Sequence, residues 1–135
     1  MHVTFEGKQI RVNVDTFLGY HTNHTMMKIF EKLNKIRAYQ RANLSFLESL
    51  EDYDIICEIG NAQEAGTFTT AKQLLLCQIG APATLRRRLE RMVNLGVVTK
   101  ARNAQDGRMA ELRLVPDVLK AYAKLGKHIE KLDKS

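Results

Sequence analysis

PATLRRRLERMVNLGVVTKARNAQDGRMAELRL, residues 82–114, places one helix pattern directly before two strand patterns. Pro82 suits the first position of a helix, because its missing N–H group would have no partner there. Leu85, Leu89 and Met92 then recur at steps of four and three residues, which is the spacing of one helical face. The sequence therefore predicts an amphipathic helix over 82–95, with these three side chains in the core.

The end of this helix and the two strands follow from the next residues. Gly96 is suited to the left-handed conformation that often terminates a helix. Residues 97–101 and 109–115 predict two strands, and residues 102–108 predict the loop that joins them. The segment therefore combines a helix with a β-hairpin.

A shorter helix is predicted on the N-terminal side. Either Thr69 or Thr70 can cap it, and Leu74, Leu75 and Cys77 form its apolar face. We expect it to stop near residues 79–80, where a tight turn leads into Pro82. The order helix, turn, helix, strand, loop, strand is that of a winged helix-turn-helix.

Four further elements are predicted outside this motif. Alternating apolar residues over Val3–Val14 predict a β-hairpin. Helical spacing predicts a helix over Asn23–Ala42 and a second from Leu44 to about Gln63. Pro116 opens a last helix, whose buried side is formed by Val118 or Leu119 with Tyr122, Leu125 and Ile129.

We therefore expect a mainly α protein with a small amount of β structure. Its centre is a winged helix-turn-helix domain for DNA binding, residues 43–115. The N-terminal hairpin and helix, residues 1–42, and the C-terminal helix, residues 116–135, are predicted to be flanking dimerisation elements. The apolar faces of these flanking helices fit an intramolecular core equally well.

The positive charge is concentrated in the same region. The chain has 21 Lys and Arg against 15 Asp and Glu, for a net charge of +6. Residues 81–113 hold eight basic and three acidic residues, a net charge of +5, whereas residues 43–66 hold six acidic residues and no Lys or Arg. One basic surface of this kind is typical of a protein that binds a polyanion, although a solvated basic helix gives the same charge.

Arginine is the side chain best suited to guanine, because its planar fork donates to both O6 and N7. A helix over 82–95 is about 20 Å long and fits the major groove. On its face we expect Thr84, Arg87 and Arg91 to contact base edges. The other basic side chains, expected at phosphates or on the wing, are Arg86, Arg88, Lys100, Arg102 and Arg108.

Residues Thr69–Gly126 resemble the winged helix-turn-helix of the multiple-antibiotic-resistance regulator (MarR) family of bacterial transcription factors. The resemblance is carried by Thr84-Leu85-Arg86-Arg87, Leu95-Gly96-Val97-Val98, Asp106-Gly107-Arg108 and Glu111-Leu112-Arg113-Leu114. It implies that Arg108 enters the minor groove, oriented by Asp106. A narrow A·T-rich groove attracts arginine electrostatically, although a simple hairpin turn also accounts for this loop.

The sequence departs from the family at three places. The return strand leads into Leu114-Val115-Pro116-Asp117-Val118, where the family has Leu-Thr-x-x-Gly. Ala81 stands where Ser or Thr would cap the recognition helix. The N-terminal hairpin is not a feature of the family.

The resemblance implies a bacterial, sequence-specific transcriptional regulator, with repression as the expected effect. A single winged helix contacts few base pairs, so we expect a homodimer on a palindromic operator, open to control by a small-molecule effector. Two alternatives stay open. One is a winged-helix module that binds protein or RNA, and the other is a nonspecific DNA-binding protein.

Other classes of function find little support in the sequence. It has no nucleophile elbow, no phosphate-binding Gly-rich loop and no paired carboxylates, so we expect no enzymatic activity, no catalytic residues and no cofactor. Cys57 and Cys77 are expected to be small buried apolar residues rather than redox sensors, because Asp54 and Glu58 oppose a low thiol pKa at Cys57.

Metal and membrane sites are not expected either. His21 and His24 lie three residues apart, and we expect polar surface rather than a metal site. Without a signal peptide or an apolar run long enough for a membrane helix, we expect a cytoplasmic protein with no membrane partner.

Overall fold

The computed structural model describes residues 2–11, 23–102 and 109–134, and the chain divides into two compact units between Arg37 and Ala38. The first unit contains a hairpin of strands β1 (His2–Phe5) and β2 (Lys8–Arg11). The turn residues Glu6 and Gly7 both have positive φ, as a tight two-residue hairpin turn requires. The hairpin predicted over 3–14 is confirmed for residues 3–11, and residues 12–14 lie outside the described part.

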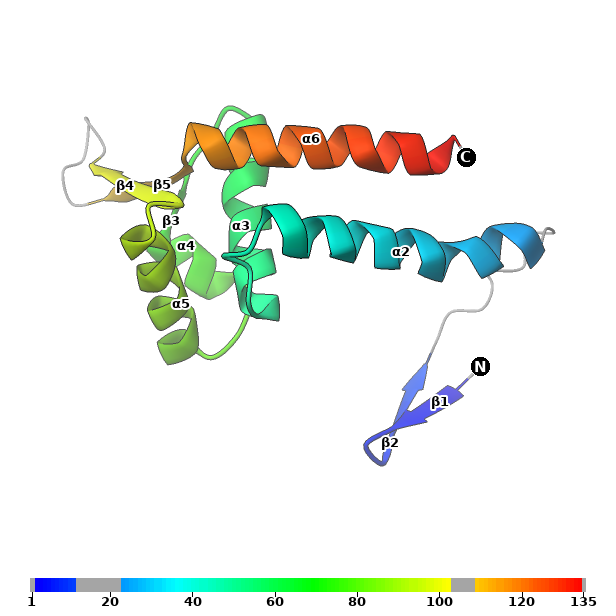
Figure 1. The fold of residues 1–135 in the computed structure, drawn as a ribbon. Coiled ribbons are helices and arrows are strands. Elements are labelled where there is room, and N and C mark those ends of the chain that lie inside the picture. The colour runs from blue at the N-terminus through cyan, green and yellow to red at the C-terminus, as the bar shows by residue number, and fades with distance from the viewer. Residues whose placement is uncertain (1, 12–22, 103–108, 135) are drawn as a thin grey trace. The chain divides into compact units, whose positions relative to one another are not determined.

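Helix α2 (Asn23–Asn43) agrees with the helix predicted over 23–42. The other elements all belong to the second unit: α3 (Leu50–Glu64), β3 (Thr69–Thr70), α4 (Ala71–Leu76), α5 (Pro82–Asn94), β4 (Val98–Arg102), β5 (Ala110–Leu114) and α6 (Pro116–Asp133). The three strands form an antiparallel sheet in the order β3-β5-β4 (Figure 1). The mainly α winged-helix fold predicted from the sequence is confirmed.

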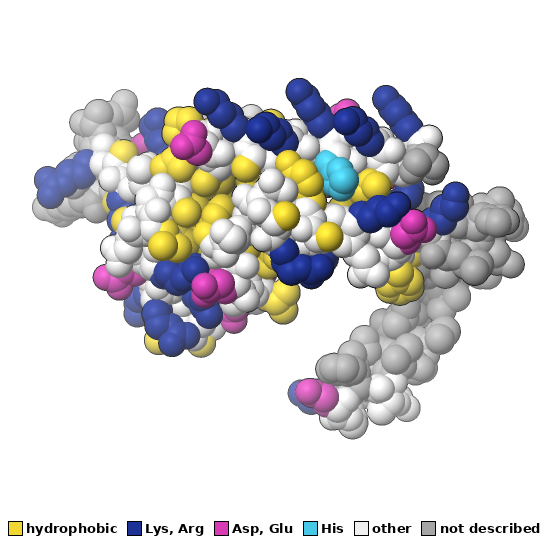
Figure 2. Space-filling view, viewed as in Figure 1, with side chains coloured by type: hydrophobic (Ala, Val, Ile, Leu, Met, Phe, Trp, Pro, Cys, Tyr) yellow, Lys and Arg dark blue, Asp and Glu magenta, His cyan; other side chains and the backbone are white. Residues whose placement is uncertain are grey.

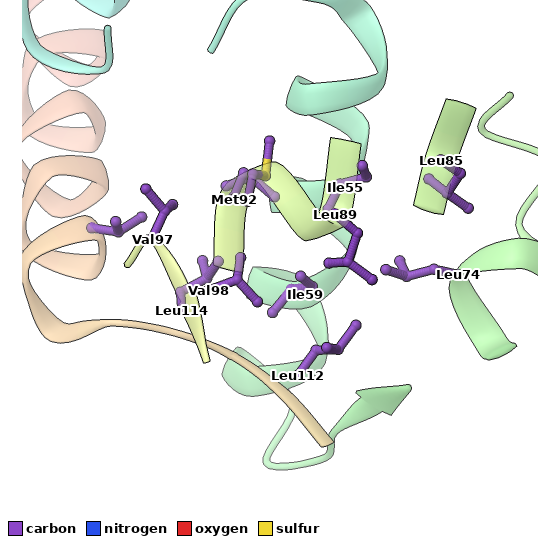
Figure 3. Close-up of a cluster of buried hydrophobic side chains, with 12 residues drawn as sticks. Ile55, Ile59, Leu74, Leu85, Leu89, Met92, Val97, Val98, Leu112 and Leu114 are labelled. Atoms are coloured by element: carbon purple, nitrogen blue, oxygen red, sulfur yellow. The ribbon is translucent and has the colours of Figure 1, made fainter. Parts of the chain in front are cut away.

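One hydrophobic core joins the helices of the second unit to the sheet. Leu85, Leu89 and Met92 of α5 are buried, as predicted, and pack with side chains of α3, α4, β4 and β5 (Figure 3). The completely buried partners are Ile55, Ile59, Leu74 and Leu112. Because α5 inserts its whole apolar face into this core, its opposite face is turned toward solvent.

The start of α3 differs from the prediction. Leu44 and Leu47 continue the helical spacing, but the helix begins at Leu50. Ser49 and Asp52 form a capping box in which each side chain accepts a hydrogen bond from the backbone N–H of the other. Leu44 is buried without being part of α3, so its apolar character serves packing rather than that helix.

Helix α4 is shorter than predicted. It ends at Leu76 rather than near residue 79, and Gln78 adopts a left-handed conformation with φ of 55°. Thr70 is its N-cap, one of the two residues predicted for that role. The prediction that Cys57 and Cys77 are buried is wrong, because both residues are exposed, although the Cys57 thiol is partly desolvated. Cys77 follows the last turn of this short helix and therefore misses the core face.

Gly96 has φ of 74° after α5, which confirms the predicted left-handed termination. Helix α6 begins at Pro116 and buries Val118 and Leu125, whereas Leu119 is exposed. In the described part of the chain, no helix is long and apolar enough to cross a membrane.

Candidate DNA-binding surface

Helix α5 presents two arginines to solvent. The side chains of Arg86 and Arg87 are exposed, and neither forms an ion pair with another described residue. Thr84, in the first turn of the helix, is half-buried. Since Leu85 and Leu89 fix the rotation of the helix through the core, the direction in which Arg86 and Arg87 project is fixed as well.

Strand β4 adds two exposed cations beside this helix. Lys100 and Arg102 are two residues apart on one strand and therefore share a face of the sheet. Their register is set by pairing with Leu112 and Ala110 of β5. The remaining predicted wing residues, Asp106 and Arg108, lie outside the described residues.

Arg88 and Arg91 are engaged inside the protein. The helical spacing predicted that Arg91 points to solvent, but its Nη2 lies 2.8 Å from Glu48 Oε1, and its Nη1 donates a hydrogen bond of 2.8 Å to the Phe46 carbonyl. Arg88 Nη1 lies 3.3 Å from Glu48 Oε2. The side chains of Arg88 and Arg91 are only 23% and 27% exposed.

Asp52 is the buried centre of this cluster. It is fully inaccessible, and its Oδ2 accepts the backbone N–H groups of Glu48 and Ser49 while lying 3.6 Å and 3.7 Å from the Nη1 atoms of Arg88 and Arg91. A buried carboxylate is strongly destabilising without a partner charge. The two arginines therefore hold α5 against the start of α3.

Sequence reasoning missed these acidic partners. The Ser49-x-x-Asp52 pattern was an available signal for the start of α3. It carries no information about which arginine, about forty residues later, would lie beside the carboxylate.

Two contacts from the α3–α4 region fix the base of the wing. The guanidinium of Arg113 lies 4.1 Å from the ring centroid of Phe68, as a cation–π pair. Gln63 Oε1 of α3 accepts a hydrogen bond of 2.7 Å from the backbone N–H of Leu114. Strand β5 is thus joined to α3 and to the residue before β3, and it shares the hydrophobic core with α5.

A separate cavity of about 240 Å³ lies where α3 approaches α6. Its walls include Ile56, Cys57, Gly60, Leu114 and Tyr122. The Tyr122 hydroxyl is buried and has no hydrogen-bond partner among the described residues. Burial raises the pKa of Tyr122 well above its ordinary value, so its hydroxyl keeps its proton and can donate to a bound acceptor.

The two thiols lack the surroundings of a reactive cysteine. Partial burial raises the pKa of Cys57, and the charges of Asp54 and Glu58 raise it further. Desolvation, followed by Glu58, raises the pKa of Cys77 in the same direction. A thiolate at either position is therefore disfavoured at neutral pH.

The described part of the chain contains no group of three or more His, Cys, Asp or Glu side chains placed to bind a metal ion. The side chains of His21 and His24, the pair considered from the sequence, are not among those described.

No protein-family model matches the chain, and no curated protein matches its sequence. The fold is similar to a mutant of S. aureus MepR bound to an oligodeoxyribonucleotide, with a TM-score of 0.63, 11% identity, and coverage of 92% of this chain and 81% of that one. A MarR family transcription regulator matches with a TM-score of 0.51, 17% identity, and coverage of 90% and 79%.

The organohalide-sensing transcriptional regulator RdhR, in its 2,4-dichlorophenol-bound form, matches with a TM-score of 0.51, 18% identity, and coverage of 99% of this chain and 75% of that one. At these identities the similarity concerns the fold. The winged-helix fold of this chain is that of MarR-type transcription regulators, over most of its length.

Proposed function

We propose that this protein is a sequence-specific DNA-binding transcriptional regulator that acts as a homodimer on a palindromic operator, with repression as its expected effect. The observation that carries the proposal is the pair of exposed arginines, Arg86 and Arg87, on a helix whose rotation is fixed by the core. Helix α5 has 13 residues and a length of about 20 Å, which suits the major groove.

In this proposal the side chains of α5 contact different parts of the DNA. Arg87 and Thr84 contact base edges, and Arg86 contacts a phosphate. Lys100 and Arg102 extend the phosphate contacts toward the wing, where Arg108 enters the minor groove with Asp106 orienting it. Arg88 and Arg91 approach DNA only where they exchange a contact with Glu48 for one with a phosphate.

The dimer proposal rests on exposed apolar side chains. Phe30 is 72% exposed on α2, and Ile29 and Leu33 of the same helix are 44% and 47% exposed. Three large apolar residues within five positions form a patch of the kind that a second copy covers. We propose α2 together with α6 as the dimerisation elements.

The test is selection from a pool of random duplex DNA over a series of salt concentrations, followed by sequencing of the retained duplexes. An enriched palindrome, with affinity that falls steeply as salt rises, supports a specific dimeric regulator. Retention without an enriched site favours a nonspecific DNA-binding protein. No retention at low salt overturns the proposal in favour of a module that binds protein or RNA.

We also propose that the cavity between α3 and α6 holds a small effector. It is mostly apolar, and the unpartnered Tyr122 hydroxyl is a donor beside the polar residues Asn61 and Glu64, so it suits an aromatic molecule that carries an acceptor group. A panel of phenols and benzoates, screened by thermal unfolding, tests this idea. A ligand that stabilises the wild type but not Tyr122→Phe supports the site, and equal stabilisation of both proteins contradicts it.

A further inference from the structure

Five lysines form a single line along α6 and its C-cap residue, Lys134. They occur at steps of four, three, four and three residues: Lys120, Lys124, Lys127, Lys131 and Lys134. At 100° per residue they fall within an arc of about 80° and extend over about 21 Å of the helix. All five are exposed, and none has an ion-pair partner among the residues that the structure describes. We call this set the lysine stripe.

The lysine stripe lies opposite the buried side of α6. Val118 and Leu125 point into the protein from the other half of the helix, and Asp117 and Glu130 flank the stripe without interrupting it. Like charges at positions i and i+4 of a helix repel each other, by a few tenths of a kcal/mol per pair. The arrangement therefore carries a cost in the free protein that a bound anion removes.

The stripe is also separate from α5. In Figure 1, α6 extends along the top of the view, and α5 lies at the lower left. Figure 2 shows dark-blue side chains along the upper edge over α6 and a second basic group at the lower left, over α5. A duplex held by Arg86 and Arg87 therefore leaves the lysine stripe uncovered.

We propose that the lysine stripe binds the sugar–phosphate backbone of a second duplex, so that the protein bridges two DNA segments. The inference rests on the proposed DNA-binding function, since it requires a first duplex on α5. The spacing of positive charges along the stripe is close to the spacing of phosphates along DNA. Each DNA strand carries one phosphate per roughly 3.4 Å of axis, and the stripe carries one ammonium group per roughly 5 Å. Long flexible lysine stems cover the difference, and as point charges they contribute no base preference.

Charge also argues against a second copy of the chain as the occupant. Two-fold contact between two lysine stripes would bring like charges together in a buried interface, which is unfavourable. The lysine stripe is therefore not the face of α6 that we expect in the proposed dimer interface.

The experiment is a two-duplex capture assay with the full-length protein. A duplex retained in the random-pool selection is immobilised, protein is bound to it, and a labelled random duplex is then added and its capture measured across a salt series. The wild type is expected to capture the labelled duplex. The variant Lys124→Gln with Lys127→Gln and Lys131→Gln is expected to bind the immobilised duplex as before, but to lower the salt slope of second-duplex capture by about 2.7.

Two control variants separate charge from other effects. Lys124→Arg with Lys127→Arg and Lys131→Arg keeps the charge and is expected to retain capture. Lys28→Gln with Lys35→Gln removes exposed lysines from α2 and is expected to retain capture as well.

The outcomes distinguish the two proposals. A wild type that binds no duplex overturns both. Normal binding of the first duplex without capture of the second, or equal capture by the wild type and the Gln variant, overturns bridging alone. Loss of capture in the α2 control also overturns it, as does binding of the stripe to phosphatidylserine vesicles without duplex capture.

Discussion

Asp52 Oδ2 lies 3.7 Å from Arg91 Nη1, although the two residues come from different helices. The same oxygen caps the start of α3 through the backbone N–H of Ser49. One buried carboxylate thus serves both a local function, the helix cap, and a long-range function, the seating of α5. This double role makes the orientation of α5 depend on an acidic residue outside it.

Replacing Asp52 is therefore expected to destabilise the protein strongly. Asp52→Ala removes the cap and leaves two partly buried guanidinium groups without that partner, so the free energy of unfolding is expected to fall by about 3–5 kcal/mol. Urea unfolding measures this change. The control is Asp54→Ala, an exposed acid on the same helix, with a change within about 0.5 kcal/mol. Similar losses in both variants would contradict the structural role of Asp52.

Removing the charge of Glu48 is expected to strengthen DNA binding. Its carboxylate contacts both Arg88 and Arg91, and it is 56% exposed, so Glu48→Gln frees these cations at a stability cost of at most about 1 kcal/mol. We expect a roughly two- to fivefold gain in affinity, since such an exposed pair contributes up to about 1 kcal/mol. Titration of labelled duplex measures it, with Glu64→Gln as the matched loss of charge. Equal gains in affinity for both variants would show that the effect comes from net charge and not from the release of Arg88 and Arg91.

Arg87 and Arg86 are expected to differ in specificity. Arg87→Ala should cost about 1–3 kcal/mol on the selected duplex and relax its sequence preference, because a base contact is lost. Arg86→Ala should weaken all duplexes about equally, because a phosphate contact is lost. Competition between selected and random duplex measures the ratio. The assignment fails if both variants lower specific and nonspecific binding in the same proportion.

Gln78 offers a test of the turn between α4 and α5. Its φ of 55° is a conformation that glycine adopts at lower cost than residues with a Cβ. Gln78→Gly is expected to raise the free energy of unfolding by about 0.5–1 kcal/mol. Urea unfolding measures the change, and Gln78→Ala serves as the control without that gain. A glycine variant no more stable than the alanine variant would show that the turn is unstrained.

Cys57 is expected to react slowly near neutral pH. Partial desolvation and then the charges of Asp54 and Glu58 raise its pKa above the ordinary 9.0, so the reactive thiolate is only a small fraction near neutral pH. Alkylation by iodoacetamide in a Cys77→Ser background is expected to accelerate continuously as pH rises through 9.0. A rate that levels off below that pH would instead indicate a low-pKa thiol suited to redox sensing.

Local patterns predicted the central part of the fold well. The apolar face of α5 and the glycine after it are encoded within a few residues of each other, by Leu85, Leu89, Met92 and Gly96. The start of α3 was less predictable. Leu44 and Leu47 continue the helical spacing of apolar residues, but Ser49 is the N-cap and the helix begins only at Leu50. The burial of Cys77 depended on an α4 one turn longer than the real one.

The candidate site was predicted in type but not in detail. Spacing places Arg86, Arg87 and Arg91 on one exposed side, and it contains no information about Glu48 and Asp52, which reach α5 through tertiary packing. The lysine stripe, by contrast, was present in the sequence as a regular repeat. The net charge of this segment does not reveal the lysine stripe, because the negative charges of Asp117, Glu130 and Asp133 offset part of its positive charge.

The helix starts of the second unit are of two kinds. Helices α3 and α4 begin with reciprocal side-chain caps, whereas α5 and α6 begin without a side-chain cap. In α5, the backbone N–H of Leu85 donates a hydrogen bond to the Ala81 carbonyl. The backbone N–H groups of Ala83 and Thr84 have no side-chain cap. In the proposed complex, a phosphate at the start of α5 would therefore break no side-chain cap.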